Sequence, residues 1–144
     1  MGAIQDLIKQ IRGEAPNQEA AILDIIAENE TLLVDMNTGQ LMEGLDADSV
    51  QLKKYASEHY AMMKASLNPR HVTDLYLGGA FHRSFFAVTD NWPVRFGASD
   101  IKTDELTKKY GTSIFGLTEK NKALLAQEYV KGPIIEYYRE IFQL

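Results

Sequence analysis

Apolar residues recur at helical spacing near both ends of the chain and at nearly alternate positions in its middle. The first run follows the i, i+3, i+4, i+7 pattern of one helix face, through Ile4, Leu7, Ile8 and Ile11. We therefore predict a short amphipathic helix over residues 4–12 that ends at Gly13. A break is expected at residues 14–17, with Asn17 as the N-cap of the next helix.

A longer helical pattern begins at Gln18. Its apolar positions are Ile22, Ile25, Ile26, Leu32, Leu33 and Met36. Asn29 interrupts this apolar face once. Gly39 is a candidate for the C′ position, the first residue after the helix end. The pattern predicts a long helix that fades at residues 37–39. An amphipathic helix must bury its apolar face, so we expect this face in the core or against another subunit.

Residues 43–54 are rich in turn formers and predict a loop. Glu43, Asp46 and Asp48 make it acidic. A calcium loop counted from Asp46 needs glycine at its sixth position and glutamate at its twelfth. Those positions hold Gln51 and Ser57, so a solvated acidic turn is the preferred interpretation.

A short helix over residues 57–65 and a β-hairpin are predicted next. The hairpin strands are residues 85–89 and 92–98, which are rich in aromatic and β-branched residues and flank Asp90-Asn91. Pro93 cannot donate a backbone hydrogen bond, which suggests that its strand has one open edge.

Gly78 and Gly79 separate the apolar run 73–77 from the aromatic segment that contains Phe81 and Ser84. Glycine adopts positive φ angles easily and permits a close approach of another backbone. We expect a tight structural corner here. A phosphate-binding loop is the weaker alternative, because no Lys-Ser or Lys-Thr pair follows the glycines.

The last third predicts a short helix over residues 103–110, an extended segment at 112–117, and a C-terminal helix capped by Thr118. Gly132-Pro133 should kink that helix. The expected fold class is α+β: a long N-terminal helix and a C-terminal helix packed on a small antiparallel sheet. Residues 1–15 are predicted to form a short helical arm and residues 16–144 a single domain.

Composition narrows the possible functions. The 144 residues contain no cysteine, which excludes disulfides and thiolate metal sites. The net charge of −5 offers no broad basic face, so we expect no direct nucleic-acid binding. No apolar run is long enough for a membrane span, and the first residues lack the features of a secretory signal.

No catalytic, cofactor or metal site is predicted. The three histidines, His59, His71 and His82, do not form a metal-binding spacing, and His82 beside Arg83 is expected on the polar surface. The nucleophile-elbow, phosphate-loop and dinucleotide-binding motifs do not occur. A small hydrolase or metal-dependent enzyme stays an alternative without a supporting motif.

Two segments carry a family resemblance. The first is Leu75-x-Leu77-x-Gly79-x-Phe81-x-x-Ser84-Phe85, and the second is Ile114-Phe115-Gly116-Leu117-Thr118-Glu119-Lys120-Asn121 before the last helix. Over about residues 20–144 the chain resembles the tail-completion or virion-morphogenesis proteins of tailed bacteriophages. In that family a corner precedes a hairpin, and a step like the second segment leads into the final helix.

The resemblance implies a virion protein, made in the cytoplasm of a bacterial host, that acts at the phage neck or tail end as a tail-completion or tail-terminator protein. It implies a ring of identical copies that contacts portal, connector or tail-tube proteins, without catalytic residues. Another virion or phage-encoded protein–protein interaction module, without catalytic activity, is the alternative. The candidate corner and interface residues are Gly78, Gly79, Phe81, Ser84, Trp92, Phe96, Phe115 and Gly116.

Overall fold

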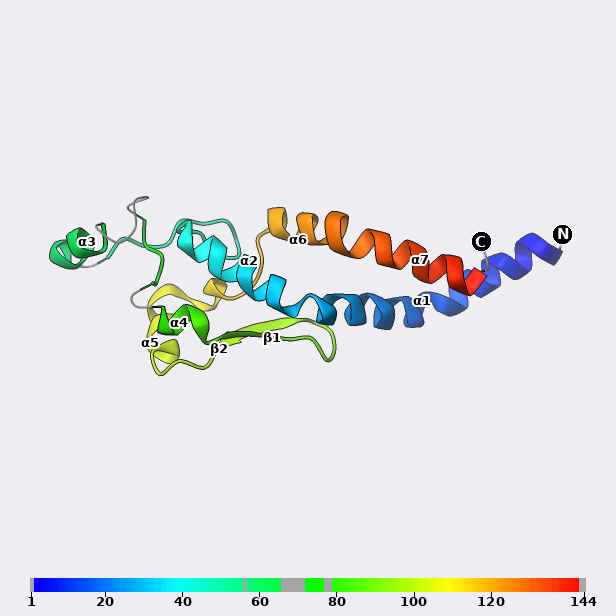
Figure 1. The fold of residues 1–144 in the computed structure, drawn as a ribbon, viewed down its shortest axis with the longest axis horizontal. Coiled ribbons are helices and arrows are strands. Elements are labelled where there is room, and N and C mark those ends of the chain that lie inside the picture. The colour runs from blue at the N-terminus through cyan, green and yellow to red at the C-terminus, as the bar shows by residue number, and fades with distance from the viewer. Residues whose placement is uncertain (1, 56, 66–71, 77–78, 143–144) are drawn as a thin grey trace.

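The computed structural model describes residues 2–55, 57–65, 72–76 and 79–142. Two successive helices, α1 (Gly2–Glu28) and α2 (Glu30–Met42), form the central axis of an elongated molecule (Figure 1). The C-terminal helices lie along one side of this axis and a β-hairpin lies along the other. Both termini are at the same end of the molecule.

The predicted break at residues 14–17 is wrong, because α1 is continuous from Gly2 to Glu28. The apolar positions keep one phase through this segment. Ile4 and Ile22 are 18 residues apart, which is about five turns of a helix with 3.6 residues per turn. One uninterrupted helix therefore presents both stripes on the same face, with Ile4, Leu7 and Ile8 exposed at its start.

The interruption falls at Asn29 instead, between α1 and α2. Its side-chain amide donates to the Ile25 carbonyl at 2.8 Å. The predicted end at residues 37–39 is also wrong, since Gly39 lies inside α2 and that helix continues to Met42. The last turns of α2, at and beyond the predicted end, contact a distant segment of the chain through two buried amide side chains.

The first buried amide is that of Asn37, which is fully inaccessible to solvent. Its Nδ2 donates to the Ile114 carbonyl at 2.9 Å, and its Oδ1 accepts from the Gly116 N–H at 3.0 Å. One side chain thus satisfies a backbone donor and a backbone acceptor in a segment nearly 80 residues away.

The second buried amide is that of Gln40, one helical turn later. Its Nε2 donates to the Gly116 carbonyl at 2.9 Å. Its Oε1 accepts from the Thr118 N–H at 2.9 Å and from Asn121 Nδ2 at 2.7 Å. We call the contacts of Asn37 and Gln40 the amide clamp; it fixes the segment that leads into the C-terminal helices.

Those helices begin as the sequence predicted. Thr118 caps α6 (Glu119–Leu125), because its hydroxyl accepts from the Asn121 N–H at 3.2 Å. A π-helical turn, η2 (Ala126–Val130), then leads into α7 (Lys131–Phe142). Pro133 has no N–H to bond the carbonyl four residues before it, and the irregular turn lies just upstream of it.

Two antiparallel strands, β1 (Phe85–Val88) and β2 (Arg95–Ala98), confirm the predicted hairpin. Phe85 and Ala87 are buried while Phe86 between them is exposed, as expected for a strand with one covered face. Together with the helices this small sheet gives an α+β fold, which confirms the predicted fold class.

The remaining short elements lie toward the end of the molecule opposite the termini (Figure 1). They are α3 (Glu58–Ala65), α4 (Ala80–Arg83), α5 (Thr103–Tyr110) and the 3-10 turn η1 (Thr112–Ile114). The sequence predicted an extended chain at η1. The tight turn brings Ser113 to the carboxylate of Asp46, where its hydroxyl donates at 2.9 Å.

Asp46 itself corrects the prediction of a solvated acidic turn. It is buried, and its Oδ1 accepts from the Asp48 and Val50 N–H groups at 2.9 Å each. Glu43 and Asp48 are exposed as expected. The carboxylate of Asp46 therefore shapes the loop from inside, in the manner of an Asx turn.

Buried apolar residues form two clusters that meet along α2. The first joins α1, α2, β1 and the start of the C-terminal helices: Ile26, Leu33, Met36, Ala87, Leu117 and Leu125. The second lies around the corner before the hairpin: Leu41, Leu52, Leu75, Phe81, Phe85 and Ile114. Because α2 contributes to both clusters, it is the element on which the rest of the fold is assembled.

We predict that Gln40→Ala destabilises the protein by about 2–4 kcal/mol, because it leaves buried partners on residues 116 and 118 without hydrogen bonds. Urea denaturation followed by circular dichroism measures the change. Gln127→Ala, at an exposed position, is the matched control and should alter stability by no more than about 0.5 kcal/mol. Equal midpoints for the two variants would contradict the role of the clamp.

Candidate protein-interaction site

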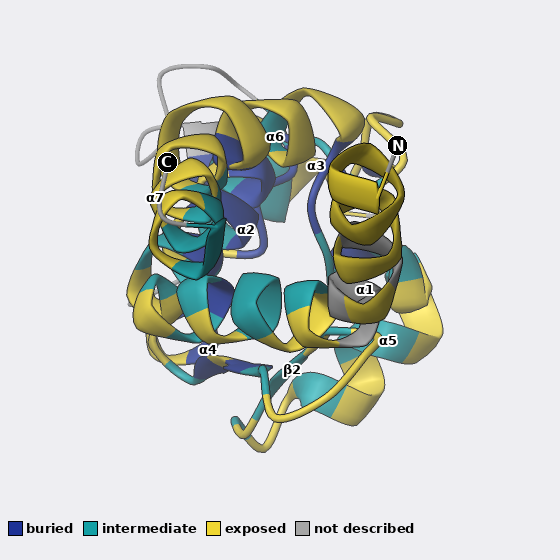
Figure 2. Cartoon of the chain, turned by 90° about the vertical axis from the view of Figure 1, so that its right-hand side faces the viewer, coloured by how far each residue is buried: buried dark blue, intermediate teal, exposed yellow. Residues whose placement is uncertain are grey.

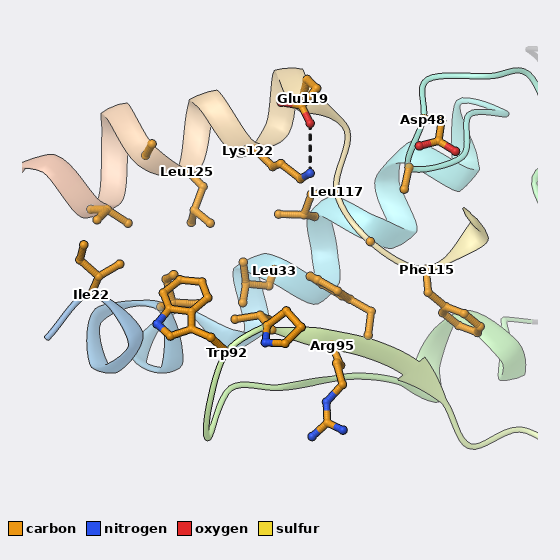
Figure 3. A pocket seen from close by; sticks show the side chains of 18 of the residues that line it. Ile22, Leu33, Asp48, Trp92, Arg95, Phe115, Leu117, Glu119, Lys122 and Leu125 are labelled. Carbon is orange, nitrogen blue, oxygen red and sulfur yellow. Dashed lines mark hydrogen bonds and ion pairs between the residues drawn. The ribbon is translucent and has the colours of Figure 1, made fainter. Parts of the chain in front are cut away.

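A wide apolar groove of about 1120 Å³ lies between the central helices, the hairpin and the start of the C-terminal helices (Figure 3). Its apolar lining comes from elements far apart in sequence: Ile22, Ile26, Leu33, Val94, Leu117, Leu125 and Val130. Apolar surface that faces an open groove is a recurrent property of sites that bind another molecule.

Charged and aromatic side chains surround this groove. Asp48, Arg95, Glu119 and Lys122 line its edges, and Lys122 Nζ pairs with Glu119 Oε1 at 3.1 Å (Figure 3). Trp92 is 47% exposed and donates its indole N–H to the Glu19 carbonyl at 3.4 Å. An apolar centre surrounded by charged and polar side chains is the usual arrangement of a protein–protein interface.

A second apolar surface lies at the start of α1. Ile4 is 68% exposed, Leu7 45% and Ile8 44%, and we call these three residues the α1 stripe. Viewed from the end that carries the termini, the first turns of α1 are exposed, whereas the buried residues gather on α2 (Figure 2). Large aliphatic side chains grouped on one exposed helical face mark a contact surface.

Four of the eight residues predicted from the sequence lie together at the groove. Trp92, Phe96, Phe115 and Gly116 all line it. Phe96 is half-buried, because it packs against the first core cluster, whereas Trp92 is exposed. Gly116 has a φ of +120°, and both its N–H and its carbonyl are held by the amide clamp.

Three further predicted residues form the corner before the hairpin. Gly79 has a φ of +84° and precedes α4, and the Phe81 ring is buried against Phe85 at a centroid distance of 4.9 Å. Ser84 accepts from the Asp100 N–H at 3.0 Å, which joins the two ends of the hairpin. Gly78 lies outside the described residues.

A buried ion pair lies next to this corner. Lys64 Nζ is 2.9 Å from Asp74 Oδ1, and the two side chains are 3% and 1% exposed. The same carboxylate oxygen accepts from the Tyr76 N–H at 2.9 Å and from the Tyr55 hydroxyl at 3.3 Å. Asp74 thus links α3 to the segment before the corner. Removing either member of such a pair leaves a buried charge, which costs about 3–5 kcal/mol.

Burial also affects the phenols around this pair. It raises the pKa of Tyr55 to about 12, and the nearby Asp74 carboxylate adds to the shift. Tyr55 and Tyr60 meet edge-on at 4.9 Å and, with Tyr110 and two lysines, line a small pocket of about 440 Å³. At neutral pH these tyrosines are uncharged hydrogen-bonding groups.

His82 corrects a prediction from the sequence, because it is buried and does not lie on the polar surface. Its Nε2 lies 2.8 Å from the carbonyl oxygen of Asp74, so that nitrogen carries the proton and donates. Burial lowers the pKa of His82 below its usual 6.5, and the positive charge of Lys64 acts in the same direction. His82 therefore stays neutral at pH 7 and joins α4 to the ion pair.

The polar groups that the sequence did not single out are Asn37, Gln40, Lys64 and Asp74. One signal was present for the first two. Asn37 and Gln40 lie three residues apart beside Leu33 and Met36, so they fall on the apolar face of their helix. Amides on such a face must find buried partners. No local pattern marks Lys64 or Asp74.

Within residues 2–55, 57–65, 72–76 and 79–142, no three histidine or acidic side chains are placed to hold a metal ion. In the same ranges no helix is both long and apolar enough to cross a membrane. Comparisons of the chain with protein-family models, with curated proteins and with solved structures found no match.

We predict that Gly79→Val destabilises the protein by about 1–3 kcal/mol or prevents folding, because a Cβ there would lie 2.8 Å from the Tyr76 hydroxyl at a positive φ. Gly2→Val is the matched control, since its nearest neighbour would be Asp6 at 3.8 Å. Thermal melts compare the two variants, and equal midpoints would contradict the proposed corner.

We predict that acid destabilises the native chain more than it destabilises His82→Gln. A histidine whose folded pKa is lowered contributes its full stability above about pH 6.5, and this contribution falls as the pH drops below that value. Thermal midpoints at pH 7.5 and pH 5.5 measure the effect. Equal decreases for the native chain and the variant would show that His82 is not the responsible group.

Proposed function

We propose that this chain is a structural protein of a phage or prophage particle that acts at the neck or tail end, as a tail-completion or tail-terminator protein. It works by forming a ring of identical copies at the head–tail junction, in contact with portal, connector or tail-tube proteins. The observation that carries the proposal is the presence of two separate apolar surfaces, the groove and the α1 stripe.

These surfaces favour association over catalysis. Ile26, Leu33, Leu117 and Leu125 in the groove lining are already buried, but the parts of both surfaces that are still exposed would be buried only by another molecule. Such burial drives protein association at about 25 cal/mol per Å². Because the two surfaces differ, one copy can place its stripe in the groove of a second copy while its own groove accepts the stripe of a third, which is a heterologous contact. Heterologous contacts close into rings or continue as filaments.

The buried polar groups support the same proposal. Asp74 is paired with Lys64 and accepts two further hydrogen bonds, and the amides of Asn37 and Gln40 bind backbone groups. These side chains join elements to one another, which is a structural use of polar groups. The two segments that carry the phage resemblance fall on the corner and on the segment held by the amide clamp.

A second candidate, another phage-encoded interaction module, is favoured by one observation at the opposite end of the molecule from the termini. There α3 exposes Met62 at 74% and Met63 at 43%. Methionines adapt to partners of different shape, so this end suits binding to a different protein. Such binding does not require a ring.

The proposal predicts that deletion of the gene yields unjoined heads and tails, which electron microscopy of the lysate would show. Complementation with the native chain should restore joined particles and infectivity. Complementation with Ile8→Asp should fail, since it places a charge in the α1 stripe, whereas Gln5→Asp on the same helix should succeed. Joined, infectious particles from the deletion strain would exclude the head–tail role and favour the second candidate.

A further inference from the structure

We propose that the start of α1 from one copy lies in the apolar groove of a second copy, with Ile4, Leu7 and Ile8 against the groove lining. This inference rests on the proposed function and names the two surfaces that would make the contact. It identifies the occupant of the groove as another molecule of the same chain.

The α1 stripe cannot fill the groove of its own molecule. The groove includes Ile22 and Ile26, which are on the same helix as the stripe. Ile4 precedes Ile22 by 18 residues, or about 27 Å at 1.5 Å per helical residue. Since α1 is continuous over this distance, its first turns point away from the groove, beyond the end of α7 (Figure 1).

The stripe has the form that a groove of this kind accepts. Ile4, Leu7 and Ile8 are related by i, i+3 and i+4 spacing, so they occupy one face of a single turn. An amphipathic helix that places such a face in an apolar groove is a common mode of recognition. The groove volume, about 1120 Å³, leaves room for several aliphatic side chains.

The charges beside the two surfaces are complementary. Asp6 and Lys9 flank the stripe on the exposed helix, one negative and one positive. At the groove edge Glu119 and Lys122 pair with each other, which leaves Asp48 and Arg95 exposed, one negative and one positive. A seated helix that directs Lys9 toward Asp48 and Asp6 toward Arg95 satisfies both pairs, whereas the reversed helix would bring like charges together.

Cysteine crosslinking tests the contact, because the chain contains no cysteine of its own. Ile8→Cys on the stripe and Ala126→Cys in the groove lining are made as separate full-length proteins. The two are mixed at about 100 μM and oxidised, and the products are separated on a non-reducing gel. Ile101→Cys, at a position 95% exposed and outside the groove, replaces Ile8→Cys in the control mixture.

We expect the Ile8→Cys and Ala126→Cys mixture to form a covalent heterodimer about tenfold faster than the control mixture, because thiols held side by side reach effective concentrations of about 1 mM. Equal rates in the two mixtures would overturn the inference. Faster formation of Ile8→Cys homodimers than of heterodimers would also overturn it, since the stripes would then contact each other.

The double variant Ile8→Cys/Ala126→Cys separates this inference from the proposed ring. A ladder of crosslinked products larger than a dimer supports the contact, and it also supports assembly of the copies into a ring or a filament. Products that stop at the dimer support the contact, through reciprocal exchange of helices, and count against the ring. Circular dichroism of each variant checks that the native helix content is retained.

Discussion

The hydrogen bonds of Asn37 and Gln40 are the constraint on which the rest of this structure depends. Each amide is buried in α2, and together they hold the backbone from Ile114 to Thr118. Buried amides are costly unless every donor and acceptor finds a partner. That requirement selects one position for the segment, and the segment in turn sets the direction of α6 and α7.

The direction of these helices produces the groove. Leu117 and Leu125 close the first core cluster beside α2, while further along the helices cover α1 only in part. Leu124, Tyr129 and Ile135 are each at least 40% exposed as a result. The molecule therefore has its buried core near α2 and exposed apolar side chains toward the termini.

Short sequence patterns correctly predicted the elements that depend on neighbouring residues alone. The alternation around Phe85 gave the hairpin, and the Thr118 side chain gave the start of the last helix. The break at residues 14–17 was wrong, since α1 continues through Gly13 and Pro16 with Ile4 and Ile22 in the same helical phase. Local helix-breaking signals are a weak guide to where a long helix ends.

The candidate site was predictable only in part, because some of its residues are brought together only by tertiary contacts. Trp92, Phe96, Phe115 and Gly116 were identified from aromatic content and motif, and they do meet at the groove. The clamp joins residues 76 to 81 positions apart, and the ion pair of Lys64 and Asp74 depends on how α3 docks. Such partners become visible only when tertiary structure brings them together.

Hydrogen–deuterium exchange measured on dilute and on concentrated protein tests the central claim, that the α1 stripe and the groove are covered by association between copies. The account predicts that amides in residues 2–10 and in residues 119–130 become protected together on concentration, while those in α5 do not change. Unchanged exchange in both segments, under conditions in which larger species form, would contradict it.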